Sequence, residues 1–175
     1  CISSQVGCAL GCKFCATGKM GILRNLPPGE IVGQVLLMKE EAKVPPTNIV
    51  YMGMGEPMNN YEHVMKAADI ISDPEGLCFS RKRITISTSG ILPGIYRMAD
   101  EKQPYSLAIS LNATTQDTRK EIMPVTKKYT LDELMTAARY YAKKTGKRVS
   151  FEYILIDKYN SSMEDAKRLV KLTHG

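Results

Sequence analysis

The sequence lacks long apolar runs and any recognisable signal peptide, so nothing in it predicts a membrane span or export. Hydrophobic residues make up 43% and charged residues 24% of the 175 residues, as in an ordinary globular protein. This length is enough for one domain with its own core. Because the chain starts at Cys1 rather than at methionine, we expect a piece of a longer protein.

Cysteine is also scarce, and its placement argues against an extracellular disulfide framework. The five cysteines are an odd number, and three of them crowd between Cys8 and Cys15. Extracellular frameworks spread their cysteines more evenly and pair them. A cytoplasmic protein whose cysteines bind a metal or take part in catalysis fits this distribution better.

Positive charge is in excess over negative charge. The net charge is +6 and the isoelectric point is about 9.0. This excess favours a polyanionic partner such as RNA without identifying one, because many basic proteins bind no nucleic acid. The basic candidates are Lys13, Lys19, Arg24, Arg81–Arg83, Arg119–Lys120 and Lys127–Lys128.

Short apolar runs alternate with segments of helical periodicity along the chain. Strands are predicted at residues 2–6, 48–52, 84–88, 105–111 and 148–156. Helices are predicted at residues 28–43, 60–71, 93–102, 115–122, 130–144 and from 161 onward, with Asn60, Thr130 and Ser161 as N-caps. Five strand–helix units in this order predict an α/β fold with a parallel sheet and right-handed crossovers. Periodicity alone leaves open whether that sheet is doubly wound or a curved partial barrel.

The segment with the clearest chemistry is Cys8-Ala-Leu-Gly-Cys12-Lys-Phe-Cys15. Closely spaced cysteines on a loop can hold an iron–sulfur cluster, and three of them leave the fourth iron open to an external chelator. The alternative is structural zinc, which usually takes four ligands, often in two cysteine pairs. The spacing favours iron–sulfur, because the remaining cysteines and histidines are isolated in the sequence.

A CxxxCxxC motif after a predicted strand, with Phe14 before the last cysteine, resembles the signature of the radical S-adenosylmethionine (SAM) superfamily. The resemblance implies a [4Fe–4S] cluster held by Cys8, Cys12 and Cys15, with SAM bound to the open iron. It also implies a full or partial parallel (βα) barrel, commonly of six units, of which about five are expected here.

Three further segments at the carboxyl ends of predicted strands fit the same resemblance. Gly53-Met-Gly55-Glu56-Pro57 resembles the motif that binds the amino group of SAM, which implies Gly55 and Glu56 as ligands. Ser87 and the run Ser110-Leu111-Asn112 end the next two strands, and the resemblance implies contacts with the carboxylate and ribose of SAM. Each segment taken alone also fits an ordinary turn or a strand-end cap.

A closer resemblance, to the RlmN/Cfr family of radical SAM RNA methyltransferases, covers essentially the whole chain. It is carried by residues 1–18, 52–57, 85–90 and 108–112. It implies methylation of adenine C2 in 23S rRNA and in tRNA, with the methyl group first carried on a C-terminal cysteine. Cys1 matches the second catalytic cysteine of that family. Without the resemblance, a small buried hydrophobic side chain would be the simpler interpretation of Cys1.

The resemblance also implies boundaries and partners. Residues 1–175 correspond to the radical SAM core domain, without the N-terminal RNA-binding domain, the last strand and the methyl-carrying cysteine. The family often has histidine where this chain has Asn112. We expect a cytoplasmic monomer without membrane association, served by an electron donor such as flavodoxin. Lys19 and Arg24 are the predicted RNA contacts, because they lie near the cysteines and phosphate contacts dominate such binding.

Three alternatives stay open from the sequence. One is a Cfr-like enzyme that methylates adenine C8, and a second is a radical SAM enzyme acting on a small molecule or a protein. The third is a zinc-stabilised RNA-binding module without catalysis.

Overall fold

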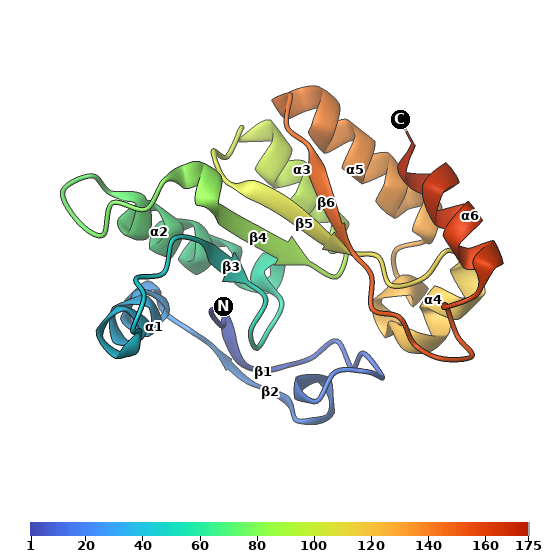
Figure 1. Cartoon of the computed structure of the whole chain (residues 1–175), viewed down its shortest axis with the longest axis horizontal. Helices are drawn as coiled ribbons and strands as arrows, with labels where there is room; N and C mark the ends of the chain where they lie inside the picture. The colour runs from blue at the N-terminus through green and yellow to red at the C-terminus, as the bar shows by residue number, and fades with distance from the viewer. Residues whose placement is uncertain (175) are drawn as a thin grey trace.

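A computed structural model describes residues 1–174 and shows a four-stranded parallel sheet (Figure 1). Its strands, in spatial order, are β3 (Ile49–Tyr51), β4 (Ile84–Thr88), β5 (Ser106–Ser110) and β6 (Val149–Glu152). Spatial order follows chain order, and helices connect successive strands, as in a (βα) barrel that does not close. The expected α/β class with a parallel sheet is confirmed.

Residues 1–174 form six α-helices and four short 3-10 helices, and Figure 1 shows α3 and α5 packed along the sheet. The α-helices are α1 (Pro28–Glu41), α2 (Tyr61–Ser72), α3 (Leu92–Asp100), α4 (Gln116–Ile122), α5 (Leu131–Thr145) and α6 (Met163–Thr173). The 3-10 helices are η1 (Thr17–Lys19), η2 (Pro57–Asn60), η3 (Arg81–Arg83) and η4 (Pro124–Lys127). No helix among residues 1–174 has the length and apolar character that a membrane crossing requires.

The core lies between the sheet and the helices that follow its strands. Ile84 and Ile86 of β4 and Leu107 and Ile109 of β5 are fully buried, because their side chains share the face of the sheet that the helices cover. Side chains from α2, α3 and α5, such as Val64, Ile95 and Leu134, are equally buried and belong to the same apolar cluster. This packing fixes the strand ends that carry the site.

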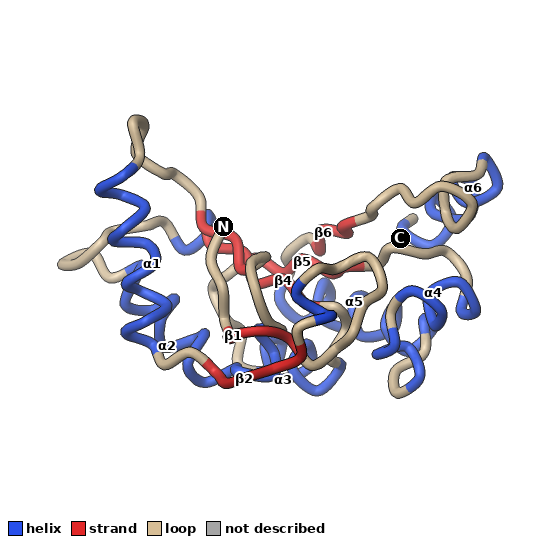
Figure 2. Tube along the Cα trace, turned by 90° about the horizontal axis from the view of Figure 1, so that it is seen from below, coloured by secondary structure: helices blue, strands red, loops and turns tan. Residues whose placement is uncertain are grey.

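The first predicted strand is placed differently from expectation. The regular strand is β1 (Gln5–Cys8), and it pairs antiparallel with β2 (Gly21–Asn25), a strand that the sequence did not predict. All residues of β2 are exposed, so it has no alternating apolar pattern to reveal it. Ile2 still lies beside β3: its N–H donates to the Val50 carbonyl at 2.9 Å, and its carbonyl accepts from the Gly53 N–H at 3.0 Å. Figure 2 shows the resulting β1–β2 hairpin as a unit separate from the sheet.

Two of the three predicted helix caps need correction. Asn60 stands at the N-cap position of α2, but its side chain donates instead to the carbonyls of Ser4 and Leu26, both at 2.8 Å. The last helix is capped by Ser162, one residue after the expected Ser161, in a capping box with Asp165. The Thr130 capping box of α5 is confirmed, as is its end at Gly146.

Candidate active site

One cavity of about 290 Å³ brings together eight of the site residues that the sequence predicted. The predicted site residues that line it are Cys8, Cys12, Cys15, Gly55, Glu56, Ser87, Ser110 and Asn112. They come from the end of β1 and from the carboxyl ends of β3, β4 and β5, which is where parallel α/β folds place ligands. Leu111, which is fully buried, is the one predicted SAM-contacting residue that does not line it.

The cysteine loop starts from a backbone conformation that requires glycine. Cys8 is the last residue of β1, and Gly7 before it has a φ of +80°. A Cβ on Gly7 would overlap the carbonyl oxygen of Gly21 on the paired strand. The hairpin therefore closes only with glycine at this position, and its closure sets where Cys8 enters the loop.

The rest of the loop is anchored on the opposite half of the chain. The N–H of Lys13 donates to the carbonyl of Ile122 in α4 at 2.9 Å. Cys12 and Phe14 pack against a small apolar cluster formed by Ala113, Ile122, Met123 and Val125. The Cys15 N–H donates back to the Cys12 carbonyl at 3.1 Å, which tightens the turn between these two thiols.

The thiols lie in a partly desolvated setting. Burial raises the pKa of Cys8, and burial together with the neighbouring thiols of Cys8 and Cys15 raises the pKa of Cys12 to about 11. Without a metal these groups are protonated at neutral pH, so binding a metal releases their protons.

The donor set is of the kind that an iron–sulfur cluster takes. Within residues 1–174, no group of three or more His, Cys, Asp or Glu side chains is arranged to hold a single metal ion. Cys8, Cys12 and Cys15 come from one loop and line one cavity. Thiolates are the usual ligands of iron–sulfur clusters, and three of them leave one iron of a cubane without a protein ligand, so the residues present fit such a group.

Gly55 and Glu56 connect β1, β3 and β4 through close packing and hydrogen bonds. Gly55 has a φ of +99°, and a Cβ there would lie 2.6 Å from the Gln5 side chain. The Glu56 carboxylate is buried and accepts from the Met58 N–H at 3.0 Å, the Ser89 N–H at 2.8 Å and the Ser89 hydroxyl at 2.7 Å. Burial raises the pKa of Glu56, and these donors oppose the rise.

The strand ends beyond β4 and β5 supply further polar groups. Ser87 lines the cavity with its side chain nearly buried, and Ser110 is half-buried. Asn112 adopts a left-handed backbone conformation with φ of 56°, and its Oδ1 accepts from the Ile154 N–H at 2.9 Å. Its carbonyl accepts from the side chain of buried Asn160 at 2.7 Å. Asn112 therefore also joins β5 to the chain that follows β6.

Arg119 is buried, although its sequence context predicts an exposed residue. It stands in a basic pair with Lys120 and was grouped with candidate RNA contacts, yet only 1% of it is exposed. Its guanidinium donates to the carbonyls of Ser89, Ser110 and Leu111 and to the Thr126 hydroxyl. The available sequence signal was its spacing from Ile122, which places both side chains on the inner face of α4.

The remaining predicted residues lie outside the cavity. Cys1 is exposed, and it does not line the cavity. Lys19 is in η1, and Arg24 is in β2, so both belong to the hairpin side of the molecule. The Arg24 guanidinium is paired with the Glu30 carboxylate at 2.7 Å and 3.1 Å, and both side chains are about half exposed.

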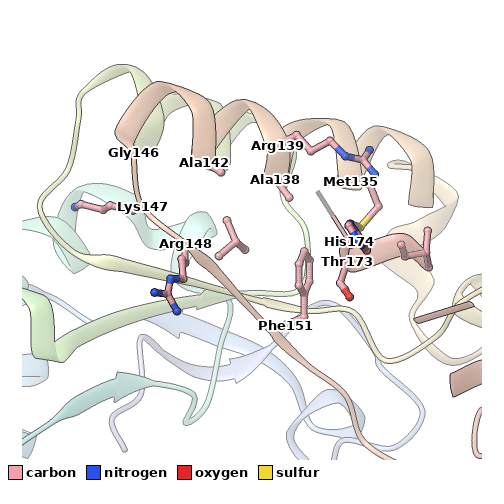
Figure 3. A pocket seen from close by; sticks show the side chains of 12 residues that line it. Met135, Ala138, Arg139, Ala142, Gly146, Lys147, Arg148, Phe151, Thr173 and His174 are labelled. Carbon is pink, nitrogen blue, oxygen red and sulfur yellow. The ribbon is translucent and has the colours of Figure 1, made fainter. Parts of the chain in front are cut away.

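A second, larger cavity of about 420 Å³ lies elsewhere and lacks such chemistry. It is enclosed by α5, β6 and the end of α6, and Figure 3 shows Ala138 and Ala142 on one side and Phe151 on the other. It lies at the start of β6, where Arg148 and Val149 line it, and it contains no cysteine. The smaller cavity is the candidate active site because the donors converge there.

Comparison with known proteins identifies the family of the chain. A family model described as the radical SAM superfamily matches residues 2–170. The chain is 52% identical over 177 residues to the probable dual-specificity RNA methyltransferase RlmN of Moorella thermoacetica, covering 98% of this chain and 50% of that protein. A protein of the same name from Dictyoglomus turgidum is 49% identical over 180 residues, covering 100% of this chain and 51% of that protein. The chain thus spans about half the length of the curated relatives it matches.

A solved structure supports the same fold. The crystal structure of a radical SAM methyltransferase from Sphaerobacter thermophilus superposes with a TM-score of 0.94 at 48% identity, covering 100% of this chain and 52% of that chain. This match decides between the two arrangements that periodicity left open, in favour of the partial barrel. The chain therefore belongs to the radical SAM superfamily, whose cofactors are a [4Fe–4S] cluster and SAM, and over its whole length it resembles the RlmN RNA methyltransferases.

Proposed function

We propose that residues 1–175 are the radical SAM core domain of an enzyme that methylates adenine C2 in 23S rRNA and in tRNA. The methyl group passes through a methyl-cysteine located outside this chain, and an external one-electron donor such as flavodoxin serves the reaction. The enzyme works as a cytoplasmic monomer. The printed name of the relatives, dual-specificity RNA methyltransferase, supports RNA as the substrate.

The observation that carries the proposal is the meeting of three thiols and four strand ends around one cavity. Its volume of about 290 Å³ is near the lower end of the range typical of small-molecule sites, roughly 300 Å³ and above. Cys8, Cys12 and Cys15 are the proposed cluster ligands. When bound there, the cluster and SAM would supply one-electron reductive cleavage of a carbon–sulfur bond. Ordinary methyl transfer from SAM does not work at adenine C2, because that carbon is not nucleophilic.

The other lining residues bind and orient SAM in this proposal. The carbonyls around Gly55 and the Glu56 carboxylate provide acceptors for the SAM ammonium group. Ser87, Ser110 and Asn112 provide hydroxyl and amide groups for its carboxylate and ribose. Leu111 is fully buried, so its contribution is to hold the backbone between Ser110 and Asn112 rather than to present a side chain.

The proposed RNA contacts lie on the hairpin. Lys19 and Arg24 offer positive charge for phosphates, and Arg24 must exchange its Glu30 partner for a phosphate to do so. An exposed ion pair of this kind contributes little to stability, so the exchange is not costly. Cys1, on the exposed start of the chain, is proposed to resolve the protein–RNA adduct.

Cluster assembly tests the metal assignment directly. The full-length protein and its Cys8→Ser, Cys12→Ser and Cys15→Ser variants are reconstituted anaerobically, and iron, sulfide and SAM cleavage are measured. We expect four irons and cleavage in the parent, loss of both in each variant, and no change in Cys78→Ser, whose thiol is exposed and remote from the cavity. One tightly bound zinc and no SAM cleavage would instead support a structural RNA-binding module.

Product analysis tests the reaction. The full-length enzyme is incubated with unmodified 23S rRNA and tRNA, and the digested nucleosides are identified by mass spectrometry against synthetic standards. We expect 2-methyladenosine from both RNAs. Exclusive formation of 8-methyladenosine would replace the proposal with the Cfr-like alternative, and SAM cleavage without any RNA product would point to a small-molecule or protein substrate.

A further inference from the structure

Arg119 is a buried cation without a carboxylate partner. Its four hydrogen bonds, of 2.6 to 3.0 Å, all go to neutral oxygens: the carbonyls of Ser89, Ser110 and Leu111 and the Thr126 hydroxyl. Within residues 1–174, no Asp or Glu oxygen lies within ion-pair distance of it. A lone buried charge is costly, so it calls for a compensating negative charge.

The position of Arg119 indicates where a compensating negative charge would be bound. The carbonyls that it binds end β4 and β5, the strands whose residues Ser87 and Ser110 line the active-site cavity. Its helix, α4, is also the element on which the cysteine loop rests, through the Lys13–Ile122 hydrogen bond. The guanidinium therefore bonds to the backbone of Ser89 and Ser110, two residues that line the cavity into which the three cysteines also face.

The electrostatics agree with this position. Burial lowers the pKa of Arg119 to about 10, and only the negative charge of a Cys12 thiolate opposes this fall. A guanidinium keeps its proton at neutral pH, so this side chain is a permanent positive charge behind the strand-end residues Ser89 and Ser110 of the cavity wall.

We propose that Arg119 is a positioning residue that acts as the buried counter-charge of the thiolate-held cluster and makes its reduction easier. The inference rests on the proposed function, because it takes Cys8, Cys12 and Cys15 as the cluster ligands. Three thiolates leave the bound cluster with net negative charge, and one electron from an external donor increases it. A fixed cation nearby favours the state with the added electron, since cluster potentials depend on nearby charge and on hydrogen bonding.

A purely structural role is the competing explanation. In that case the guanidinium only joins the ends of β4 and β5 to η4, and its charge is incidental. The two roles differ in what a neutral substitute changes, because the side chain of Gln can still donate to a strand-end carbonyl while Lys keeps the charge but loses the planar fork.

The experiment is a redox titration of the reconstituted full-length protein with dithionite, followed by electron paramagnetic resonance of the reduced cluster. The variants are Arg119→Gln and Arg119→Lys, and Lys120→Met is the matched control because it removes an exposed charge from the next position of the same helix. We expect a more negative midpoint potential in R119Q, and a potential near the parent value in R119K and K120M.

Each outcome is decisive. An R119Q protein with its full iron content and the parent potential would overturn the proposal, as would an equal shift in K120M. Should R119Q take up no iron, R119K decides: full uptake with the parent potential supports the requirement for charge, and failure of R119K as well would show a structural role only. A parent protein that never takes up iron would refute the proposed function itself, before this inference is reached.

Discussion

The Glu56 carboxylate holds the end of β4 by accepting two hydrogen bonds from one residue, Ser89, through its N–H at 2.8 Å and its hydroxyl at 2.7 Å. Glu56 follows β3, so this contact joins two neighbouring strand ends beneath the cavity. The carboxylate is fully buried and has no cationic partner among residues 1–174. The charged form of Glu56 is therefore stabilised by hydrogen bonds from these neutral donors.

Removing one of these donors should make stability more sensitive to pH. Burial already raises the pKa of Glu56 in the folded state, so its contribution to stability is largest at acid pH and falls as pH rises through that pKa. Ser89→Ala removes the hydroxyl donor and raises this pKa further. We expect a loss of about 1.5–3 kcal/mol at neutral pH, as for a hydrogen bond to a charged group, and a smaller loss at acid pH.

Urea unfolding of the parent and S89A at several pH values measures this difference. Ser80→Ala is the control, because Ser80 is exposed and its hydroxyl makes no hydrogen bond in the described chain. A loss that is constant with pH would contradict the role given to the Glu56 charge.

Gly7→Ala should open the hairpin that positions Cys8. The added methyl would collide with the Gly21 carbonyl oxygen, and the φ of +80° is strained for any other residue. We expect destabilisation of more than about 1 kcal/mol and a reduced iron content after reconstitution. Gly33→Ala is the matched control: a Cβ there meets nothing within 4 Å in α1, so it should stabilise the protein by up to about 1 kcal/mol. Equal iron content in the two variants would argue against the hairpin's role.

Asn160→Ala should loosen the far wall of the cavity. The Asn160 side chain donates to the carbonyls of Asn112 and Ile154, both at 2.7 Å, and accepts from the Ile156 N–H at 2.6 Å. Losing these contacts leaves buried backbone groups unpaired, at a cost of about 1–3 kcal/mol each before relaxation. We expect lower thermal stability and weaker SAM binding by calorimetry, whereas Asn59→Ala, at an exposed position, should change neither. Unchanged SAM affinity in N160A would show that Asn112 is held by other contacts.

Asp165 should make the start of α6 sensitive to acid. Hydrogen bonds from the Ser162 hydroxyl, and then from Thr114 and Arg168, hold the pKa of Asp165 well below its usual range. The stability that this carboxylate contributes is present above its unfolded pKa of about 3.9 and is lost as pH falls below it.

The matched variant for this carboxylate is Asp165→Asn. It should lower the free energy of unfolding by about 1–3 kcal/mol at pH 7, and the gap to the parent should shrink in acid. Thermal unfolding from pH 7 down to pH 3 checks this. A gap that persists unchanged in acid would mean that the packing of the side chain, and not its charge, is responsible.

Residue patterns within a short segment correctly predicted the elements whose ends depend on neighbouring residues. The β4 strand has the predicted bounds, and the Thr130 capping box and the stop at Gly146 define α5 as expected. The sequence motifs also identified eight of the residues that line the cavity, because strand ends of parallel units must meet at one edge. The partial barrel itself required more than periodicity, since an open sheet has the same alternation of strands and helices.

Features that depend on distant contacts were missed. The exposed β2 strand forms because Gly7 and Gly21 allow a tight antiparallel pairing, and an exposed strand carries no apolar alternation. Arg119 resembles a solvated surface residue until three strand-end carbonyls, 8 to 30 residues away in the sequence, surround it. Asn60 has the residue type of a cap, but carbonyls from the hairpin compete for its side chain.

The anchoring of the cysteine loop on α4 has a consequence for biosynthesis. Lys13 and Glu121, which also form an ion pair of 3.2 Å, are separated by 108 residues of sequence. At translation rates of about 5–20 residues per second, the cysteine loop leaves the ribosome roughly 5–20 seconds before the helix that supports it. The speed of translation therefore sets how long the three thiols of the nascent chain remain without that support.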